Sequence, residues 1–580
     1  GANGVWKVGL GAPVSLATAG GGRILLSPIH GGALARVEHG AASGAFTLAS
    51  AGSGLPQAAI AVSGYRLAAD GFEATVAGRA ALSARGVQHL TLQTGGRLSL
   101  HGGDVRFDAA TCGPVSVQRL QVGGEEVTGL AAQLCPAPGL ATAEIGAKGW
   151  AVHARYADFT GVSASLAARL SGAAGTVDLR SGAPVQGVVQ IASATVTDTS
   201  PTRRVEAIRE AGVLTLASPQ WTGRFDVSSR SGHPLGVVTA RLDPVSGRGE
   251  ALLEVRDLAF AKDGLQPGEL SPIVASLSPM AGKVSFTGRI GWADGKVTSE
   301  GDFATDDLAL RSPLGAVTGI AARIHLTSLA PLRTAPGQLV TAARVASLVP
   351  LAPVRLTFGL DPDGLDLQSA SAGAEGGRIT LAPTRLPFDP AGKSHGALSL
   401  EAFDLGKLIA TSSLADKVDL EAVVSGVLPY TLGPDGLRFE SGRLTAIRPG
   451  RISIHRDALT TGPVTNAVQD MAFQALQALD FSQLDATVQS RPQGRLGLIF
   501  HVVGSFEPKV EQQANLKIAD ILSGKALKSY VPLPSHTPVT LNLDSSLNLD
   551  QLLSDYGHAF QFSADTQPPP PQLRSEPVQR

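Results

Sequence analysis

The chain has 580 residues, of which 43% are apolar, 17% charged and 5% aromatic, and its formal net charge is −1. The apolar fraction is that of a folded protein, so wholesale disorder is excluded. The 48 basic and 49 acidic residues are mixed along the chain and form no basic stripe. Together with the few aromatic side chains, this excludes nucleic acid as a natural partner.

Two cysteines and the absence of a long apolar run set further limits. Cys112 and Cys135 stand 23 positions apart, and they could close one loop or remain two buried thiols. No run of 18 apolar residues occurs, so the chain as given contains no segment expected to span a bilayer. Because it begins Gly-Ala-Asn-Gly without an initiator Met, we expect that an N-terminal segment, such as a membrane anchor, has been removed.

Short runs that alternate apolar and polar residues dominate the chain. Residues 284–290 place Val284, Phe286 and Ile290 on one face of a predicted strand. The same alternation recurs further along the chain at Leu356, Phe358 and Leu360; Leu365 and Leu367; Leu398 and Leu400; Val418, Leu420 and Val424; and Leu496, Leu498, Phe500 and Val502. Turn signals at 292–295, 361–364, 389–392 and 434–436 separate these runs. Strands joined directly by turns predict an antiparallel meander.

Three segments have helical spacing instead. They are residues 405–409, residues 463–484, where Pro463 suits a first turn, and residues 518–527. We expect these short amphipathic helices to cap or plug the apolar face of the sheet. The proline-rich end is predicted to be a disordered tail.

The chain is expected to divide into four segments. They are an N-terminal β segment (1–265), a central β segment (266–460), a C-terminal segment with a helix and strands (461–562) and the tail (563–580).

Sequence motifs for catalysis are missing. Gly-x-Ser-x-Gly does not occur, no two histidines lie within four residues, and no glycine-rich phosphate loop follows a predicted strand. The acidic patch Asp302, Asp306 and Asp307 is interpreted as a solvated turn. We therefore predict no enzyme activity, no cofactor and no metal site.

An ordered set of motifs resembles one family. The set comprises the Cys112 and Cys135 pair, Leu270-Ser-Pro272, Gly282-Lys-Val284, Trp292, Ala335-Pro-Gly-Gln338, Gly442-Arg-Leu-Thr-Ala-Ile447, Pro449-Gly-Arg-Ile452, Gly494-Arg-Leu-Gly-Leu498, Gly504-Ser-Phe-Glu-Pro508 and a strand near Thr540–Leu549. In this order, they resemble the YdbH family of AsmA-like bridge proteins over about residues 250–555. Residues 1–250 resemble the family only in general character.

The resemblance implies a long antiparallel β-sheet curled into an open hydrophobic groove that carries phospholipids across the Gram-negative periplasm. It implies anchoring in the inner membrane, delivery to the outer membrane, and a small outer-membrane lipoprotein that docks by β-strand addition. It also favours a disulfide between Cys112 and Cys135, because the periplasm is oxidising.

The alternating residues are then candidates for the groove wall. They are Val284, Phe286, Ile290, Leu356, Phe358, Leu360, Leu398, Leu400, Leu420, Val424, Leu496, Leu498, Phe500 and Val502.

Alternation alone is equally typical of a β-sandwich core, and two further alternatives stay open. One is a structural β-solenoid at the cell surface, and the other is a β-helical enzyme that acts on polysaccharide. The residues do not indicate the direction of transport, the lipid selectivity, the energy source, the oligomeric state or which face lines the groove.

Overall fold

The computed structural model describes residues 8–29, 32–38, 40–84, 86–122, 125–312, 315–347, 349–389, 391–410, 416, 418–434, 436–455, 474–491, 495–508, 533 and 535–548. The chain divides into two compact units, Gly1–Phe303 and Ala304–Arg580. The division into four segments expected from the sequence stays a prediction.

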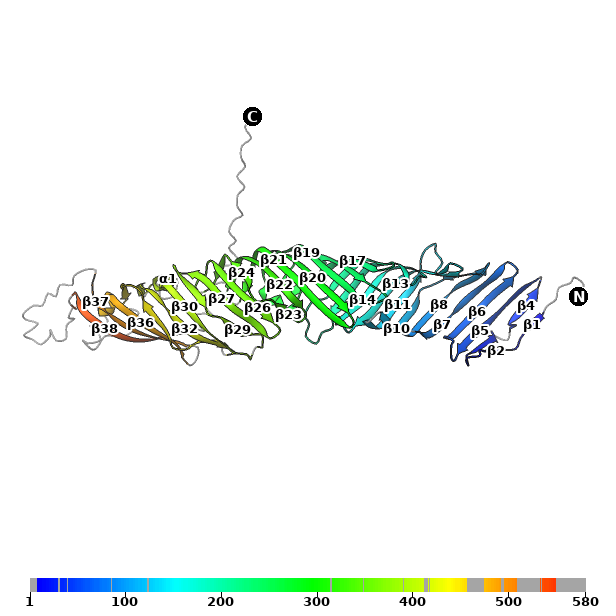
Figure 1. The fold of residues 1–580 in the computed structure, drawn as a ribbon, viewed down its shortest axis with the longest axis horizontal. Helices are drawn as coiled ribbons and strands as arrows, with labels where there is room; N and C mark the ends of the chain where they lie inside the picture. The colour runs from blue at the N-terminus through cyan, green and yellow to red at the C-terminus, as the bar shows by residue number, and fades with distance from the viewer. Residues whose placement is uncertain are drawn as a thin grey trace, which may run out of the picture. The chain divides into compact units, whose positions relative to one another are not determined.

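Unit 1 is built from strands and two short 3-10 helices (Figure 1). Its strands are β1 (Val8–Leu10), β2 (Val14–Ala17), β3 (Arg23–Pro28), β4 (Ala35–Glu38), β5 (Ala41–Ala51), β6 (Gln57–Ala68), β7 (Gly71–Ala84), β8 (Val87–His101), β9 (Asp104–Ala109), β10 (Gly113–Val122), β11 (Glu125–Pro136), β12 (Ala143–Gly146), β13 (Gly149–Ser163), β14 (Ala168–Arg180), β15 (Gln186–Asp198), β16 (Ile208–Leu216), β17 (Trp221–Ser229), β18 (Pro234–Leu242), β19 (Gly249–Phe260) and β20 (Met280–Ala293). The helices η1 (Pro267–Glu269) and η2 (Pro272–Leu277) connect β19 to β20, and β21 (Lys296–Ser312) contains the division between the units.

Unit 2 continues the same architecture with one short α-helix. Its strands are β22 (Gly315–Leu329), β23 (Leu332–Thr334), β24 (Gln338–Ala342), β25 (Arg344–Ala346), β26 (Val354–Asp361), β27 (Gly364–Ala374), β28 (Gly377–Leu381), β29 (Thr384–Pro387), β30 (Ser394–Asp404), β31 (Val418–Glu421), β32 (Val423–Gly433), β33 (Gly436–Phe439), β34 (Gly442–Ala446), β35 (Gly450–Ile454), β36 (Leu479–Arg491), β37 (Arg495–Phe506) and β38 (Thr537–Asn548). The helix α1 (Leu405–Ala410) follows β30 and confirms the first predicted helix.

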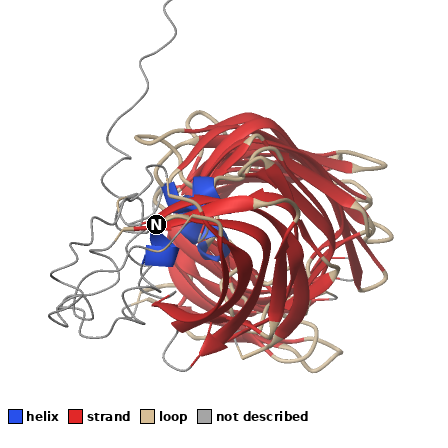
Figure 2. Ribbon diagram, turned by 90° about the vertical axis from the view of Figure 1, so that its left-hand side faces the viewer, coloured by secondary structure: helices blue, strands red, loops and turns tan. Residues whose placement is uncertain are grey.

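Antiparallel pairing of strands that are near neighbours in the chain organises both units. In unit 1 each of the strands from β13 to β20 pairs with the next one along the chain, and β8 divides its length between β9 and β10. In unit 2 short strands share longer ones, as β28 and β29 share β27. The predicted antiparallel β class is confirmed, and the strands nearest the viewer in Figure 2 curve instead of forming a flat layer.

The predicted turns join strands where the sequence indicated them. Asp294 and Gly295, between β20 and β21, both have positive φ, which is the geometry of a type I′ hairpin. Between β26 and β27, Asp361 Oδ1 accepts hydrogen bonds from the backbone N–H groups of Asp363 at 2.8 Å and Gly364 at 3.0 Å. The acidic patch Asp302, Asp306 and Asp307 was expected in a turn, which is wrong, because these residues lie within β21.

Bulges interrupt the ladders at positive-φ residues. Gly129 in β11 and Gly172 in β14 occupy two of them, as expected for a residue without a Cβ. However, Asp158 in β13, Asp257 in β19 and Ala402 in β30 hold the same backbone region. Bulges increase strand twist, so curling of the sheet depends on non-glycine residues as well.

The second predicted helix is only partly right. Residues 474–477 are helical, but Leu479–Arg491 form β36, and residues 456–473 lie outside the described residues. A bulge between Phe481 and Gln483 puts Phe481 and Leu484, three positions apart, into the same core. The spacing of three at this bulge does not distinguish the start of β36 from the end of a helix. The predicted helix at 518–527 and the tail at 563–580 also lie outside the described residues.

Candidate functional site

The strand register of unit 2 sorts its residues onto two faces, because directly paired residues point to the same side of a sheet. One row crosses nine strands, from β24 to β37, and every member is apolar or glycine. It comprises Ala342, Val354, Ala372, Ile379, Leu400, Gly426, Leu444, Ala486 and Phe500. The row defines an apolar face of the unit.

The neighbouring row points to the opposite face and is mainly polar. It comprises Thr341, Arg355, Ser371, Thr380, Ser399, Val427, Arg443, Thr487 and Ile499. Only Val427 and Ile499 break the pattern, and both are exposed. The sheet of unit 2 therefore has one polar face and one apolar face.

All the groove residues predicted in unit 2 lie on its apolar side. Phe358 is buried and pairs with Leu367, while Leu356 pairs with Ala370 and Leu360 with Leu365. The other predicted residues belong to one hydrophobic cluster or pack against it, namely Leu398, Leu400, Leu420, Val424, Leu496, Leu498, Phe500 and Val502.

That cluster fills the apolar face at the C-terminal end of unit 2. Val424 and Val502 are 0% exposed, and Phe481 is 2% exposed. Leu405 and Leu408 of α1 pack against the same cluster, as expected for a helix that caps the sheet. No lipid chain can contact Val424 or Val502 unless this packing opens, so these two residues act here as core.

Unit 1 has the same two-faced register. Its apolar row crosses nine strands from β20 back to β11 and comprises Ile290, Ala251, Ala240, Gly223, Leu214, Val189, Val177, Ala154 and Pro136. Predicted residues Val284 and Phe286 share the side of Ile290 on β20, where Val284 is buried and the other two are half-buried.

A second row in unit 1 reaches further towards the N-terminus on the same face. This N-terminal row comprises Val37, Ala42, Leu67, Phe72, Leu100, Val105, Ile145 and Trp150. It joins the first row on β13, where Trp150 and Ala154 are an even number of residues apart.

The N-terminal row is open, in contrast to the cluster of unit 2. Leu67 is 49% exposed, Leu100 39% and Ile145 58%, although all three lie on the apolar face. Large apolar side chains gathered in this way on one exposed face indicate a binding surface. The sequence analysis missed this row, because short strands and the small residues between them, such as Ala74 and Gly78, weaken the alternation.

Two titratable side chains also lie on the apolar face of unit 1. Glu210 on β16 pairs with Val227 and Ala194, and burial raises the pKa of its carboxyl. Burial likewise raises the pKa of Tyr156, and the charge of Glu210 adds to this rise. The Tyr156 hydroxyl donates a hydrogen bond to the Gln190 carbonyl at 3.0 Å. The alternation gave no signal for a carboxylate at this position.

The disulfide lies on the polar face of unit 1. Cys112 and Cys135 are bonded, and Cys135 pairs with Arg155, which belongs to the polar side of the ladder. The bond joins the start of β10 to the end of β11 and leaves the apolar face untouched.

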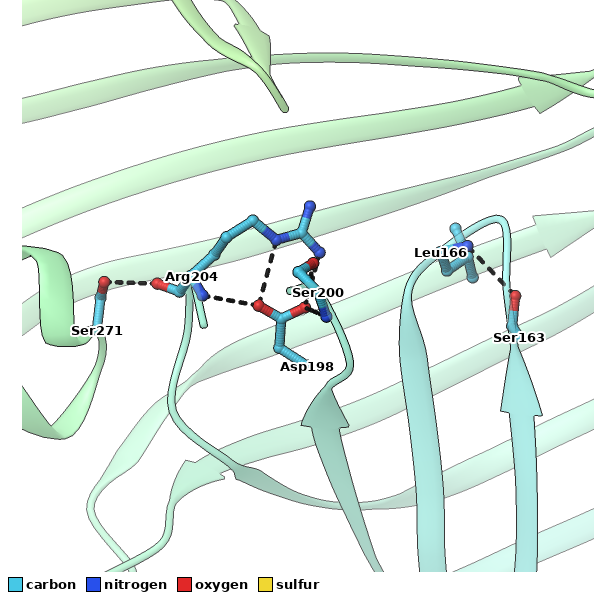
Figure 3. A network of polar contacts seen from close by, with 6 residues as sticks. All are labelled: Ser163, Leu166, Asp198, Ser200, Arg204 and Ser271. Atoms are coloured by element: carbon cyan, nitrogen blue, oxygen red, sulfur yellow. Dashed lines mark hydrogen bonds and ion pairs between the residues drawn. The ribbon is translucent and has the colours of Figure 1, made fainter. Parts of the chain in front are cut away.

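A polar network fixes the connection between β15 and β16 (Figure 3). The Asp198 carboxylate accepts hydrogen bonds from Arg204 Nη2 at 2.9 Å and from the Ser200 hydroxyl at 2.7 Å. These donors hold the pKa of Asp198 well below its usual range. The Ser271 hydroxyl, at the start of η2, donates to the Arg204 carbonyl, so the network ties two loops together and is internally satisfied.

The residues that the structure describes contain no cluster of three or more metal-ligating side chains. In the acidic patch, Asp306 is paired with Arg323 Nη2 at 2.6 Å, so its charge is matched. The helices within the described ranges include none that is long and apolar enough to cross a membrane.

One family model matches nearly the whole chain. The YdbH-like family, described as intermembrane phospholipid transport protein YdbH, matches residues 15–557. This chain belongs to the YdbH-like family. The match extends through the N-terminal strands, where the sequence had resembled the family only in general character. Searches of curated proteins and of solved structures found no match.

The family is one of intermembrane phospholipid transport proteins of the cell envelope, and its substrate is phospholipid. The family is one of transport proteins and not a class of enzymes.

Proposed function

We propose that the chain carries phospholipids through the periplasm between the inner and outer membranes by letting acyl chains slide along the apolar faces of its sheets. The observation that carries the proposal is the N-terminal row of unit 1, in which Leu67, Leu100 and Ile145 are exposed on an apolar face. A protein that needed this face only for stability would cover it.

The energetics support this kind of route. A phospholipid with about 30 methylene groups would lose on the order of 25 kcal/mol if its chains crossed water unprotected, at about 0.8 kcal/mol per group. An apolar wall removes most of that cost, while the open side leaves the headgroup in water.

The accessible and the buried parts of the apolar face have different roles in this proposal. Phe286, Ile290 and the N-terminal row contact acyl chains, whereas Val424 and Val502 hold the C-terminal strands together. The oxidising periplasm suits the Cys112–Cys135 disulfide. We also propose, from the family, attachment at the inner membrane and a small outer-membrane lipoprotein that adds a β-strand.

The β-helical alternatives receive less support. Every described strand pair in the two units is antiparallel, whereas the coils of a β-helix stack their strands in parallel.

Mass spectrometry of lipid that co-purifies with the full chain from Gram-negative cells tests the proposal. We expect phospholipid in the wild type and much less in the double variant Leu67→Asp with Leu100→Asp, because two carboxylates on the wall oppose acyl chains. The matched control is Val213→Asp with Ile499→Asp, since both residues are about 40% exposed but lie on the polar faces. Equal lipid loading of the two folded variants would contradict the proposal.

A further inference from the structure

A cavity of about 400 Å³ lies on the polar face of unit 1, near the connection between β15 and β16. Two of its lining residues, Thr195 on β15 and Arg209 on β16, are paired, and Arg209 also pairs with Ser228 on β17. Paired residues share a side of the sheet, so these side chains lie opposite Glu210, which belongs to the apolar face. The rest of the lining consists of Thr197, Arg203, Glu206, Ala207 and Arg230.

The connection that forms one wall of this cavity is fixed by hydrogen bonds. The Asp198 carboxylate accepts the backbone N–H of Arg204, which follows Arg203, at 2.7 Å (Figure 3). The Glu206 backbone N–H donates to the Leu270 carbonyl, between η1 and η2, at 2.9 Å. The wall is therefore formed before any ligand arrives, which lowers the cost of binding one.

Positive charge is in excess at the cavity. Arg203 Nη1 lies 3.4 Å from a carboxylate oxygen of Glu206, so that one cation is matched. Arg209 and Arg230 form no ion pair with any residue that the structure describes. Three guanidinium groups against one carboxylate leave the lining with two positive charges that an anion could match.

Neighbouring acids do not pair with these two arginines. Glu269 lines a second cavity together with Arg230, but its carboxylate accepts a hydrogen bond from the Ser231 hydroxyl and lies 3.4 Å from His233 Nδ1. Asp226 on β17 does not line the cavity and forms no ion pair with a described residue. The unmatched charge therefore remains at the cavity.

The donors of the lining are typical of a phosphate site. Guanidinium groups bind phosphate oxygens through pairs of N–H groups. The hydroxyls of Thr195 and Thr197 form no hydrogen bond with a described residue, so they can serve as further donors. Among the lining residues only Ala207 is apolar, so the cavity offers no surface for an acyl chain.

We propose that the three arginines of this cavity bind a phosphate group on the polar face of unit 1, with the two threonine hydroxyls completing its hydrogen bonds. The inference goes beyond the proposed function, because the site lies on the face opposite the acyl-chain route. The phosphate can belong to a lipid headgroup at a membrane surface or to a free phosphate ion, since both present the same oxygens.

Isothermal titration calorimetry of the full chain with inorganic phosphate tests the site. The double variant Arg209→Ala with Arg230→Ala should bind phosphate at least about tenfold more weakly than the wild type, because two charge-assisted contacts are lost. The matched control is Arg180→Ala with Arg224→Ala, which removes two cations from the polar face of unit 1 outside the cavity. It should bind phosphate as the wild type does.

A neutral substitution separates a built site from a general positive potential. Thr195→Val keeps the charge of the cavity but removes one donor, so it should weaken phosphate binding several-fold. Thr239→Val, on the polar face outside the cavity, should have no effect. This pair also keeps the test valid if circular dichroism shows that the double arginine variant is unfolded.

Co-sedimentation with vesicles of phosphatidylcholine and phosphatidylglycerol identifies the source of the phosphate. If the wild type sediments with the vesicles and the double arginine variant does not, the site takes lipid headgroups. If only inorganic phosphate binds, the site takes the free ion, and either result supports a phosphate site.

Three results would overturn the inference. The first is that the wild type binds neither inorganic phosphate nor the vesicles. The second is that Thr195→Val and the double arginine variant bind like their controls. The third is that succinate, a carboxylate probe, binds as tightly as phosphate.

Discussion

The apolar faces of the two units have the same register but differ in what covers them. The nine-strand row of unit 2 and the first nine-strand row of unit 1 each contain three alanines and one glycine, so side-chain size does not distinguish them. Near the C-terminus, α1 packs against the face through Leu405 and Leu408, and residues of the face such as Val424 and Val502 are fully buried. The N-terminal row has no such cover among the described residues, and its leucines stay exposed. The elements that pack against an apolar face, and not its composition, decide whether it forms a core or an exposed surface.

The largest effect on stability should come from removing a large side chain from the buried apolar face of unit 2. Phe481→Ala removes a buried ring and should cost about 3–5 kcal/mol of unfolding free energy. Leu100→Ala, on the open face, should cost less than about 1 kcal/mol, because water already contacts much of that side chain. Urea unfolding measures both. Similar losses would mean that the two faces are equally packed.

Removing the disulfide should come next. Cys112→Ser with Cys135→Ser should lower the stability of unit 1 by about 3 kcal/mol, since the bond closes a loop of about 23 residues. The bond lies on the polar face, so the lipid carried per folded molecule should not change. A loss of lipid from molecules that are still folded would show that the two faces are coupled.

A smaller contrast concerns the two faces of one ladder. Val189→Asp places a carboxylate on the apolar row of unit 1, whereas Val213→Asp places it on the polar row one strand away. We expect a loss of about 2 kcal/mol for the first and within about 0.5 kcal/mol for the second. The reverse order in thermal unfolding would invert the assignment of the faces.

The smallest effect concerns Glu210. Because burial raises the pKa of its carboxyl, the folded chain binds this proton more tightly than the unfolded chain does. Stability should therefore fall as the pH rises from the unfolded pKa of 4.5 through the raised pKa of the folded chain. Glu210→Gln should be more stable at neutral pH and should flatten this pH dependence. An unchanged pH profile of the melting temperature would contradict the burial argument.

Alternation in the sequence was sufficient to assign residues to one face of the sheet where strands are long and carry large residues. Leu398 with Leu400, and Leu496 to Val502, were placed on one side of their strands, and the register agrees. It could not show which residues would be covered, because cover depends on α1, whose side chains pack against the face from outside the strands. Val424 therefore could not be distinguished from an accessible wall residue such as Ile290.

Two other features escaped the pattern for local reasons. The helix over 463–484 was predicted from the spacing of residues up to Leu479, and the bulge after Phe481, which puts Phe481 and Leu484 three positions apart on one face, gave no signal that β36 begins there. A cavity of about 680 Å³ beside Trp150 depends on the pairing of Gly146 with Gly149 and on Ser181, which follows β14. The alternation of apolar and polar residues indicates the face on which a residue lies, but it does not indicate what the ends of neighbouring strands bring together.

The pairing of each strand with its near neighbours in sequence also affects how the molecule assembles. From β13 to β20, each new strand completes its ladder with the strand that precedes it. Contacts of such short sequence separation carry a low entropic cost of loop closure, so folding can add one hairpin at a time. A chain that enters a compartment from its N-terminus can therefore fold in the order in which it emerges, with the finished strands serving as the template for those that follow.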